Sequence, residues 1–206
     1  MPAEDGLMLA GTFYAPAEPP PWRSVILLHM IYGNSLDWGD FPKQLAEAGY
    51  AVFNLDMRGH GKTGGSTDWD QSKNDLQRVW NYLAERPDID ATCGAVIGAS
   101  MGANMGLVLA ADTPEVCAVG LLSPGLNYYD VATADKLMTY GSRPMLIIAS
   151  DEDSYSAESS RNLQEMAEGE AELVMYSQAG HGTAMLQKEP LLSKTIIVWL
   201  DQYLKP

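Results

Sequence analysis

The strongest constraint on the fold of this chain is the regular alternation of short apolar runs with segments of helical periodicity. Apolar runs of strand length recur along the chain, as at 24–29 and 91–97, and helical patterns follow them at 41–48 and 103–111. Strands that are apolar throughout are typical of a parallel sheet covered on both faces. The sequence therefore predicts an α/β fold with a mostly parallel, doubly wound sheet and helices on both faces.

The same patterns predict where each element lies. The expected strands are 7–14, 24–29, 50–55, 91–97, 116–122, 144–149 and 172–177, and the expected helices are 41–48, 71–86, 103–111, 157–167 and 191–204. No internal repeat appears, and the length suits one domain over residues 1–206. Ligands of such sheets bind beyond the carboxyl ends of the strands, so functional residues are expected in the strand-to-helix loops.

Charge and composition exclude several classes of partner. The chain has 13 Lys and Arg against 27 Asp and Glu, a net charge of −14, which disfavours nucleic acid and anionic membrane surfaces. No apolar run approaches the roughly 20 residues of a membrane helix. The start, Met1–Gly6, has neither a basic stretch nor an apolar core, so a cytoplasmic protein is expected, unless a longer precursor is secreted. Two cysteines exclude a disulfide framework and a four-cysteine zinc site.

The most informative motif is Gly98-Ala99-Ser100-Met101-Gly102, which follows an apolar strand and opens a helix. A sharp strand-to-helix turn with flanking glycines can hold a serine hydroxyl exposed for nucleophilic attack. The string alone is weak, and the strand–turn–helix context strengthens it. The alternative is that Ser100 only caps the following helix.

A nucleophilic serine needs a base and an orienting carboxylate. Among the three histidines, His181 lies between two glycines after the last strand, whereas His29 and His60 precede Ser100. The acids Asp151, Glu152 and Asp153 follow the strand 144–149. The order serine, acid, histidine, each at a strand end, is that of hydrolases.

With these motifs the chain resembles the α/β-hydrolases, and most closely the small dienelactone-hydrolase-like serine esterases that lack a cap. The resemblance covers nearly the whole chain. In that family the acid stands three residues after a small residue that ends the strand; Ser150 takes that place, which implies Asp153, with Asp151 second. The resemblance thus implies a catalytic triad of Ser100, Asp153 and His181. Dienelactone hydrolases themselves use cysteine, so Ser100 favours general ester hydrolysis.

Two further motifs resemble those of the family. Leu27–Gly33 resembles the strand and loop that donate one oxyanion-hole N–H, although Met30 replaces the usual glycine. The implied donors are the N–H groups of Ile31 and Met101. Asp56–Gly61 resembles an architectural turn, in which Asp56 and Arg58 are expected to tie loops together.

The length of one gap sets the expected size of the substrate. Caps in this family are inserted between the strands 116–122 and 144–149, and residues 123–143 leave room only for a helix or a short flap. An open, shallow pocket and short-chain carboxylic esters are therefore expected. Its possible walls, each of which could equally be ordinary loop packing, are Tyr32, Tyr128, Tyr129, Tyr155 and Met185.

The predicted activity is ester hydrolysis through an acyl-enzyme, without cofactor or metal, by a monomer or homodimer acting on a small-molecule ester. A thioesterase, an amidase or peptidase, or a cofactor-free peroxidase could use the same triad. A non-catalytic ligand-binding protein with this fold is the alternative from another class.

Overall fold

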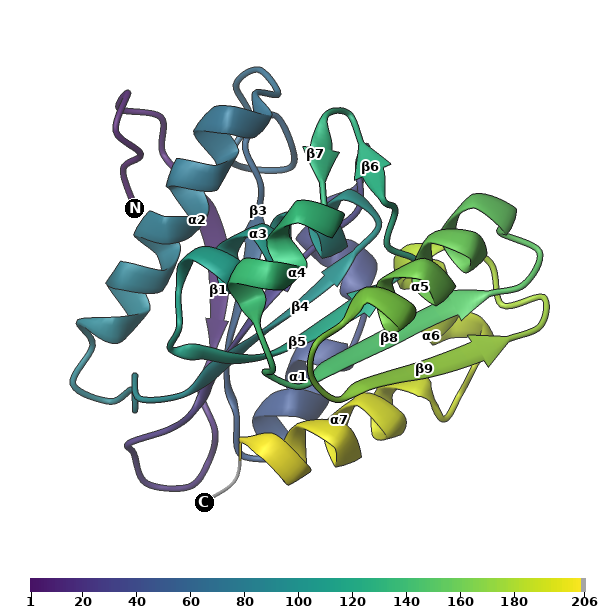
Figure 1. Ribbon diagram of the computed structural model, residues 1–206. Helices are drawn as coiled ribbons and strands as arrows, with labels where there is room; N and C mark the ends of the chain where they lie inside the picture. The colour runs from purple at the N-terminus through teal and green to yellow at the C-terminus, as the bar shows by residue number, and fades with distance from the viewer. Residues whose placement is uncertain (205–206) are drawn as a thin grey trace.

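A twisted sheet forms the centre of the molecule in the computed structural model, which describes residues 1–204 (Figure 1). The seven strands follow the order β1-β3-β2-β4-β5-β8-β9. All neighbours are parallel except β1, which pairs antiparallel with β3 at one edge. The strands are β1 (Ala10–Tyr14), β2 (Ser24–Leu28), β3 (Ala51–Asp56), β4 (Gly94–Ala99), β5 (Val116–Leu122), β8 (Met145–Ser150) and β9 (Ala171–Tyr176). The predicted doubly wound α/β fold is confirmed.

Helices cover both faces of the sheet (Figure 1). The longer ones are α1 (Phe41–Glu47), α2 (Trp69–Ala84), α3 (Met101–Asp112), α4 (Ala134–Tyr140), α5 (Ser154–Met166) and α7 (Leu192–Tyr203). One buried apolar cluster packs α2, α3, α4 and α5 against one face. The other cluster packs α1 and α7 against the opposite face. Because both faces are buried, the strands must be apolar along their whole length, which is the pattern that the sequence shows.

Most sequence-based boundaries are correct to within a few residues, and β5 matches its prediction at both ends. The strand predicted at 91–97 is displaced, because β4 runs over Gly94–Ala99. Residues 91–93 instead form a turn in which the Thr92 hydroxyl donates to Asp90 Oδ1 at 2.6 Å. The small residues that end β4 are drawn into the sheet by pairing with β5, where Ala99 lies opposite Leu122.

The segment between β5 and β8 contains a small hairpin and one helix. The hairpin consists of β6 (Asn127–Tyr128) and β7 (Val131–Ala132), and α4 follows it. Asn104 of α3 holds the hairpin, since its amide donates to Val131 O at 2.7 Å. This agrees with the prediction of a helix or short flap at this position.

The two cysteines, which the sequence did not predict to pair, form a disulfide. Cys93 and Cys117 join the start of β4 to β5, with their Cα atoms 5.3 Å apart. This single cross-link ties neighbouring strands at the end of the sheet opposite Ser100.

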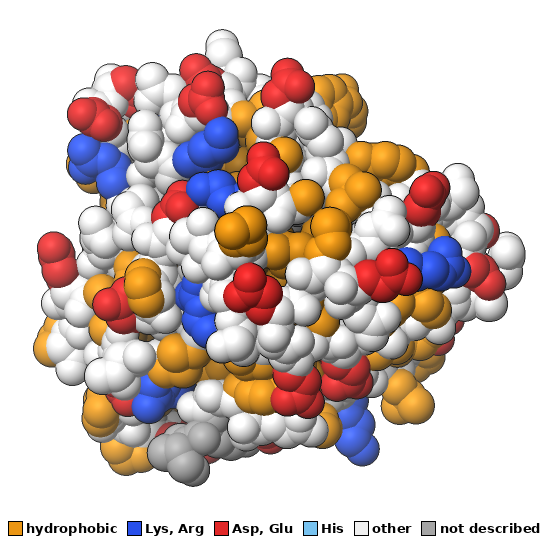
Figure 2. Space-filling model, viewed as in Figure 1, with side chains coloured by type: hydrophobic (Ala, Val, Ile, Leu, Met, Phe, Trp, Pro, Cys, Tyr) orange, Lys and Arg blue, Asp and Glu red, His pale blue; other side chains and the backbone are white. Residues whose placement is uncertain are grey.

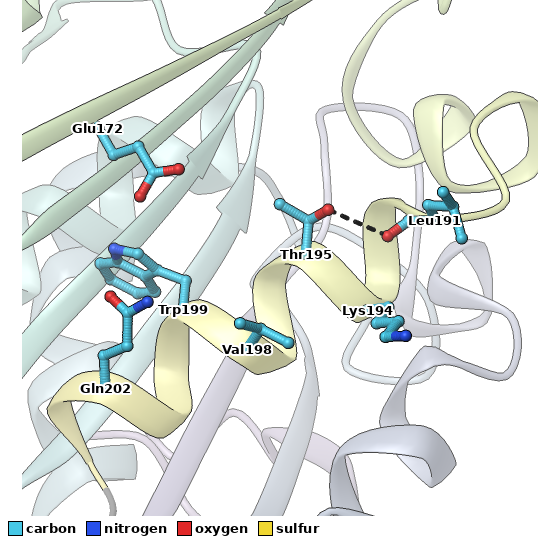
Figure 3. A pocket seen from close by; sticks show the side chains of 7 residues that line it. All are labelled: Glu172, Leu191, Lys194, Thr195, Val198, Trp199 and Gln202. Carbon is cyan, nitrogen blue, oxygen red and sulfur yellow. Dashed lines mark hydrogen bonds between the residues drawn. The ribbon is translucent and has the colours of Figure 1, made fainter.

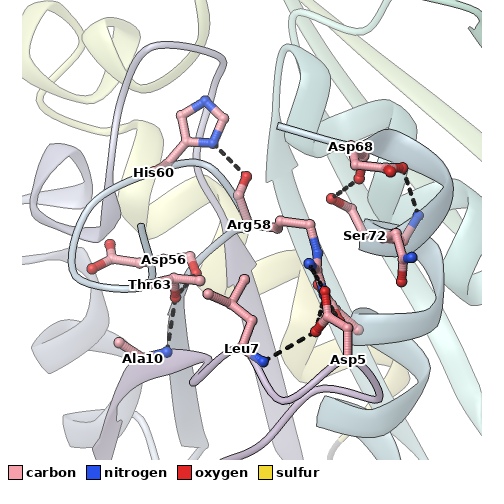
Figure 4. A network of polar contacts seen from close by, with 11 residues as sticks. Asp5, Leu7, Ala10, Asp56, Arg58, His60, Thr63, Asp68 and Ser72 are labelled. Carbon is pink, nitrogen blue, oxygen red and sulfur yellow. Dashed lines mark hydrogen bonds and ion pairs between the residues drawn. The ribbon is translucent and has the colours of Figure 1, made fainter. Parts of the chain in front are cut away.

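Arg58 is the centre of a buried ionic network (Figure 4). Its guanidinium donates to Asp75 through Nε at 2.7 Å and through Nη2 at 2.9 Å. It also donates through Nη1 to Asp5 at 2.5 Å, which fastens the N-terminal segment to α2. The hydrogen bonds to Asp75, and to a smaller extent those to Asp5, raise the pKa of Arg58. The predicted architectural role of this turn is therefore confirmed for Arg58.

Replacing Arg58 with methionine is expected to lower the free energy of unfolding by about 3 to 5 kcal/mol, because the substitution leaves the buried Asp75 carboxylate without its partner. The side chains of Arg58 and Asp75 are only 6% and 4% exposed. Urea denaturation measures the loss. Lys73→Ala is the matched control, since its pair with Asp70 is exposed and its loss should change stability by less than about 0.5 kcal/mol. Equal effects of both variants would contradict a buried network.

Acidic side chains are spread over the face of the molecule shown in Figure 2, and apolar side chains gather around the β6–β7 hairpin. A separate hollow of about 330 Å³ lies between α7 and the edge strand β9 (Figure 3). Trp199, Val198 and Glu172 contribute to its lining, and none of the candidate catalytic residues does. This hollow is therefore not the site that the sequence predicts.

Candidate active site

Ser100 occupies a strained turn between β4 and α3. Its backbone has φ 54°, in the left-handed region that residues other than glycine rarely adopt. Its N–H donates to Leu122 O at 2.7 Å. Although Ser100 stands at the position before the helix, its side chain makes no capping hydrogen bond. Strain without a cap is the pattern of a functional turn, and it does not support the alternative in which Ser100 only caps α3.

The glycines on either side of Ser100 allow close backbone contacts. A Cβ atom on Gly98 would collide with the carbonyl oxygen of Gly102. A Cβ atom on Gly102 would collide with the carbonyl oxygens of Leu28 and His29 at the end of β2. The turn can therefore form only because both flanking residues lack side chains.

Asp153 and His181 form a close pair. Asp153 Oδ2 lies 2.5 Å from His181 Nδ1. The acid follows β8 and the histidine follows β9, and these strands are neighbours with Ser150 opposite Tyr176. Because a carboxylate can only accept, the imidazole donates from Nδ1, and its Nε2 lone pair is then available to take up a proton.

Asp151, the second choice from the sequence, has a different partner. Its Oδ2 accepts the Ser177 hydroxyl at 2.8 Å, and the Asp151 side chain lies at the exposed surface. The structure thus pairs His181 with Asp153.

The His181 loop lies against the Ser100 turn. A Cβ atom on Gly182 would be 3.5 Å from Ala99 Cβ, so the residues next to His181 and Ser100 lie close together. Gly182 N–H also donates to the Ser123 hydroxyl at 2.9 Å. The geometry therefore brings the Ser100 turn and the pair of Asp153 and His181 to the same edge of the sheet.

Tyr128 of the hairpin lies near Ser100 and Asp153. Burial raises the pKa of its phenol, and the nearby negative charge of Asp153 raises it further, whereas the hydroxyl of Ser100 opposes the shift. The phenol also donates to Ser123 O at 3.4 Å. The Tyr128 hydroxyl is thus a neutral donor that is close to both Ser100 and Asp153.

Three other predicted wall residues lie at the surface. Tyr32, Tyr129 and Tyr155 are 85%, 57% and 45% exposed. The hydroxyls of Tyr32 and Tyr129 are 3.5 Å apart. The rings of Tyr155 and Tyr128 meet edge to face with centroids 5.5 Å apart.

Met185 does not belong to this surface. It starts the short helix α6 (Met185–Lys188), and its side chain is fully buried. Its sulfur accepts the Ser123 hydroxyl at 3.5 Å, so Met185 lies beneath the site and not on a wall of it. Of the two interpretations that the sequence left open for Met185, a pocket wall or ordinary loop packing, its burial supports packing. A strand-to-helix loop does not reveal which of its residues turn inward.

The two expected oxyanion donors have different surroundings. Met101 is the first residue of α3, where N–H groups have no partner within the helix. Ile31 lies in a tight turn after β2, in which Gly33 N–H donates to Met30 O at 3.1 Å. Tyr32 in the same turn has φ 63°.

His29 and His60 have structural partners. The His29 ring is fully buried; its Nδ1 lies 2.7 Å from Met30 O, and its Nε2 accepts Met57 N–H at 3.0 Å. Burial lowers the pKa of His29, which favours the neutral ring. His60 Nδ1 lies 2.9 Å from Arg58 O.

Ser123 and Ser150 were not identified from the sequence as site residues. Ser123 contacts Gly182 and Met185, and the Ser150 hydroxyl accepts Ala179 N–H at 2.9 Å. Both are buried and directly follow or end a parallel strand. A small polar residue at a strand end is the signal that could have pointed to them.

The described part of the chain has neither a cluster of metal-binding side chains nor a membrane-spanning helix. Within residues 1–204, no group of three or more His, Cys, Asp or Glu side chains is placed to hold a metal ion. No helix in that range is long and apolar enough to cross a membrane.

Comparison with protein families shows a match over more than half of the chain. Residues 19–140 match the family described as serine aminopeptidase, S33. The matched region includes the Ser100 turn and ends before Asp153 and His181. Comparison with curated protein sequences gives no match.

Several solved structures share the fold. The α/β-hydrolase GrgF from Penicillium sp. sh18 has a TM-score of 0.86 and 15% identity, covering 99% of this chain and 97% of its own. Est1E from Butyrivibrio proteoclasticus, solved with ferulic acid, has a TM-score of 0.84 and 20% identity, covering 96% of each chain. The esterase domain of a Rhodothermus marinus protein has a TM-score of 0.80 and 20% identity, covering 98% and 96%. The fold is thus that of the α/β-hydrolases.

Proposed function

The chain belongs to the hydrolase family described as serine aminopeptidase, S33, and on this premise we propose that it is a serine esterase that cleaves short-chain carboxylic esters. Ser100 is the nucleophile, His181 the general base, and Asp153 the acid that orients the imidazole. The observation that carries the proposal is the 2.5 Å pair of Asp153 and His181 beside the strained Ser100 turn.

The reaction proceeds in two steps. Ser100 Oγ attacks the ester carbonyl while His181 Nε2 takes the hydroxyl proton, and Asp153 stabilises the resulting imidazolium. The imidazolium then protonates the departing alcohol, which leaves an acyl group on Ser100. A water molecule, deprotonated by the same imidazole, attacks the acyl carbonyl and releases the carboxylic acid.

The negative charge on the substrate oxygen is met by two N–H groups. Met101 N–H is the stronger candidate for the first donor. It lies at the start of α3, where N–H groups have no partner within the helix and the positive end of the helix dipole stabilises negative charge. Ile31 N–H, from the turn after β2, is the second donor. Each such donor contributes roughly 3 kcal/mol to lowering the barrier.

The absence of a large insertion between β5 and β8 supports a small acyl group. Tyr128 and Tyr129 belong to the hairpin and Tyr155 to α5, and the hairpin and α4 are the helical and strand elements between residues 123 and 144. Aromatic side chains of this kind can hold a short acyl or alcohol group but offer no deep tunnel for a long lipid chain. The similar structure from Rhodothermus marinus is an esterase domain, which supports an ester substrate.

Assays with p-nitrophenyl esters from acetate to palmitate are expected to show the highest kcat/KM at the short end, falling by about tenfold or more toward palmitate, because longer chains gain no further burial. Each ester is assayed below its solubility limit. The highest kcat/KM on palmitate would contradict the substrate-size argument and leave the triad untouched.

A peptidase is the second candidate, because the description of the family names an aminopeptidase. Hydrolysis of aminoacyl p-nitroanilides with kcat/KM above that for p-nitrophenyl acetate would favour it. Acyl thioesters assayed in the same way separate a thioesterase. If the protein hydrolyses none of these substrates and a fluorophosphonate does not label Ser100, the result would favour a non-catalytic binding protein.

We further propose that residues 1–206 act as one domain, that the partner of the chain is a small molecule, and that the protein is a monomer or homodimer in the cytoplasm.

A further inference from the structure

The loop that carries His181 has an unusual backbone. Between the end of β9 and His181, Gln178 has φ 60° and Gly180 has φ 88°. A left-handed conformation is unfavourable for a residue with a side chain, so the conformation at Gln178 persists only if its surroundings hold it.

Successive N–H groups of this loop converge on two side chains from the end of β8. Gln178 N–H donates to Glu152 Oε2 at 2.9 Å, and Gly180 N–H donates to Glu152 Oε1 at 2.6 Å. Ala179 N–H, between them, donates to the Ser150 hydroxyl at 2.9 Å. The Ser150 hydroxyl in turn donates to Glu152 Oε2.

Consecutive N–H groups that point inward form a concave site for an anion, and here the anion belongs to the protein itself. Hydrogen bonds from the Ser150 hydroxyl and then from Gly180 and Gln178 lower the pKa of Glu152 to about 2. The carboxylate is therefore ionised at neutral pH, and both its oxygens accept charge-assisted hydrogen bonds.

We propose that Glu152 is a positioning residue for His181: its carboxylate, bound by the N–H groups of Gln178 and Gly180, fixes the loop that aims the imidazole at Ser100. This inference rests on the proposed function, because it concerns the base of that reaction. The two neighbouring acids have different roles: Asp153 binds the imidazole ring, and Glu152 binds the backbone of the loop that carries it.

Asp151 supplies a matched control. It stands on the same turn, and its carboxylate accepts the hydroxyl of Ser177 and none of the three N–H groups that bind Glu152 and Ser150 in the described residues. Asp151→Asn removes the same charge from the same region and leaves the three N–H contacts intact. An effect of general electrostatics would appear in both variants, whereas an effect of loop geometry would appear only at Glu152.

Kinetics of the full chain on p-nitrophenyl acetate form the first test. Glu152→Ala is expected to lower kcat by about 10- to 100-fold with KM changed less than about twofold, because a base displaced by a fraction of an ångström loses transition-state contact. Glu152→Gln retains one acceptor oxygen in place of two, so a smaller loss is expected. Asp151→Asn should keep the wild-type kcat.

The second test needs no activity. In the proton NMR spectrum, the short hydrogen bond from His181 Nδ1–H to Asp153 is expected to give a far-downfield resonance. Its loss in Asp153→Asn would assign the resonance to this hydrogen bond. Glu152→Ala and Glu152→Gln should broaden or remove it, and Asp151→Asn should retain it. Glu152→Gln also covers the case in which the alanine variant does not fold.

Wild-type kcat and an unchanged resonance in both Glu152 variants would overturn the proposal. An equal loss in Asp151→Asn would also overturn it, since it would indicate a charge effect. If the wild-type protein hydrolyses no ester, the resonance alone still decides the role of Glu152, so failure of the proposed function is distinguishable from failure of this inference.

Discussion

Replacement of Ser100 by alanine is expected to lower kcat for p-nitrophenyl acetate by a factor of about 10⁴ to 10⁶, because no acyl-enzyme can form without the hydroxyl. The remaining rate would come from the oxyanion donors and from binding alone. The substitution removes one oxygen atom from a residue whose side chain makes no capping bond, so the melting temperature should change little. Stopped assays at high enzyme concentration are needed to measure the residual rate.

A matched serine control makes that result specific. Ser177 is exposed, and its hydroxyl donates only to Asp151 among the hydrogen bonds that involve its side chain in the described residues. Ser177→Ala should therefore retain wild-type kcat. If Ser100→Ala kept more than about a tenth of the wild-type rate, the nucleophile would have to be another group.

Asp153→Asn is expected to lower kcat by about 10⁴-fold, the second-largest effect. The asparagine has nearly the same shape, but its amide NH₂ can donate to the imidazole Nδ1 and so favour the tautomer with the proton on Nε2. That tautomer cannot accept the proton of Ser100. The loss should therefore appear in kcat while the fold and the binding of substrate are retained.

The alternative assignment of the acid gives the contrary result. If Asp151 were the catalytic acid, Asp151→Asn would lose the activity and Asp153→Asn would retain most of it. Far-ultraviolet circular dichroism on both variants shows whether a loss of rate arises from unfolding.

The sequence predicted the sheet and the strand–turn–helix at Ser100 well for a physical reason. Buried parallel strands must be apolar on both faces, so β5 and its neighbours are visible as continuous runs. Gly98 and Gly102 are needed for close backbone contacts, and such a requirement leaves a readable pattern around Ser100. Both patterns can be read from a few consecutive residues.

Features that depend on tertiary contacts were not predictable. The strands β6 and β7 and the helix α6 are too short to show a period, and α6 turns Met185 inward. The role of Glu152 depends on the register of β8 with β9, which places Ser150 opposite Tyr176. The resemblance to the family singled out Asp153 among the three adjacent acids, but nothing in the sequence showed that Glu152 faces the backbone of the loop that carries His181.

The most direct measurement of the central claim is mass spectrometry after treatment with a fluorophosphonate that labels activated serines. We expect one adduct per chain, located by peptide mapping on Ser100, formed rapidly in the wild type and slowly in Asp153→Asn. An adduct on another residue, or none on folded protein, would contradict the assignment of Ser100 as the nucleophile of a serine hydrolase.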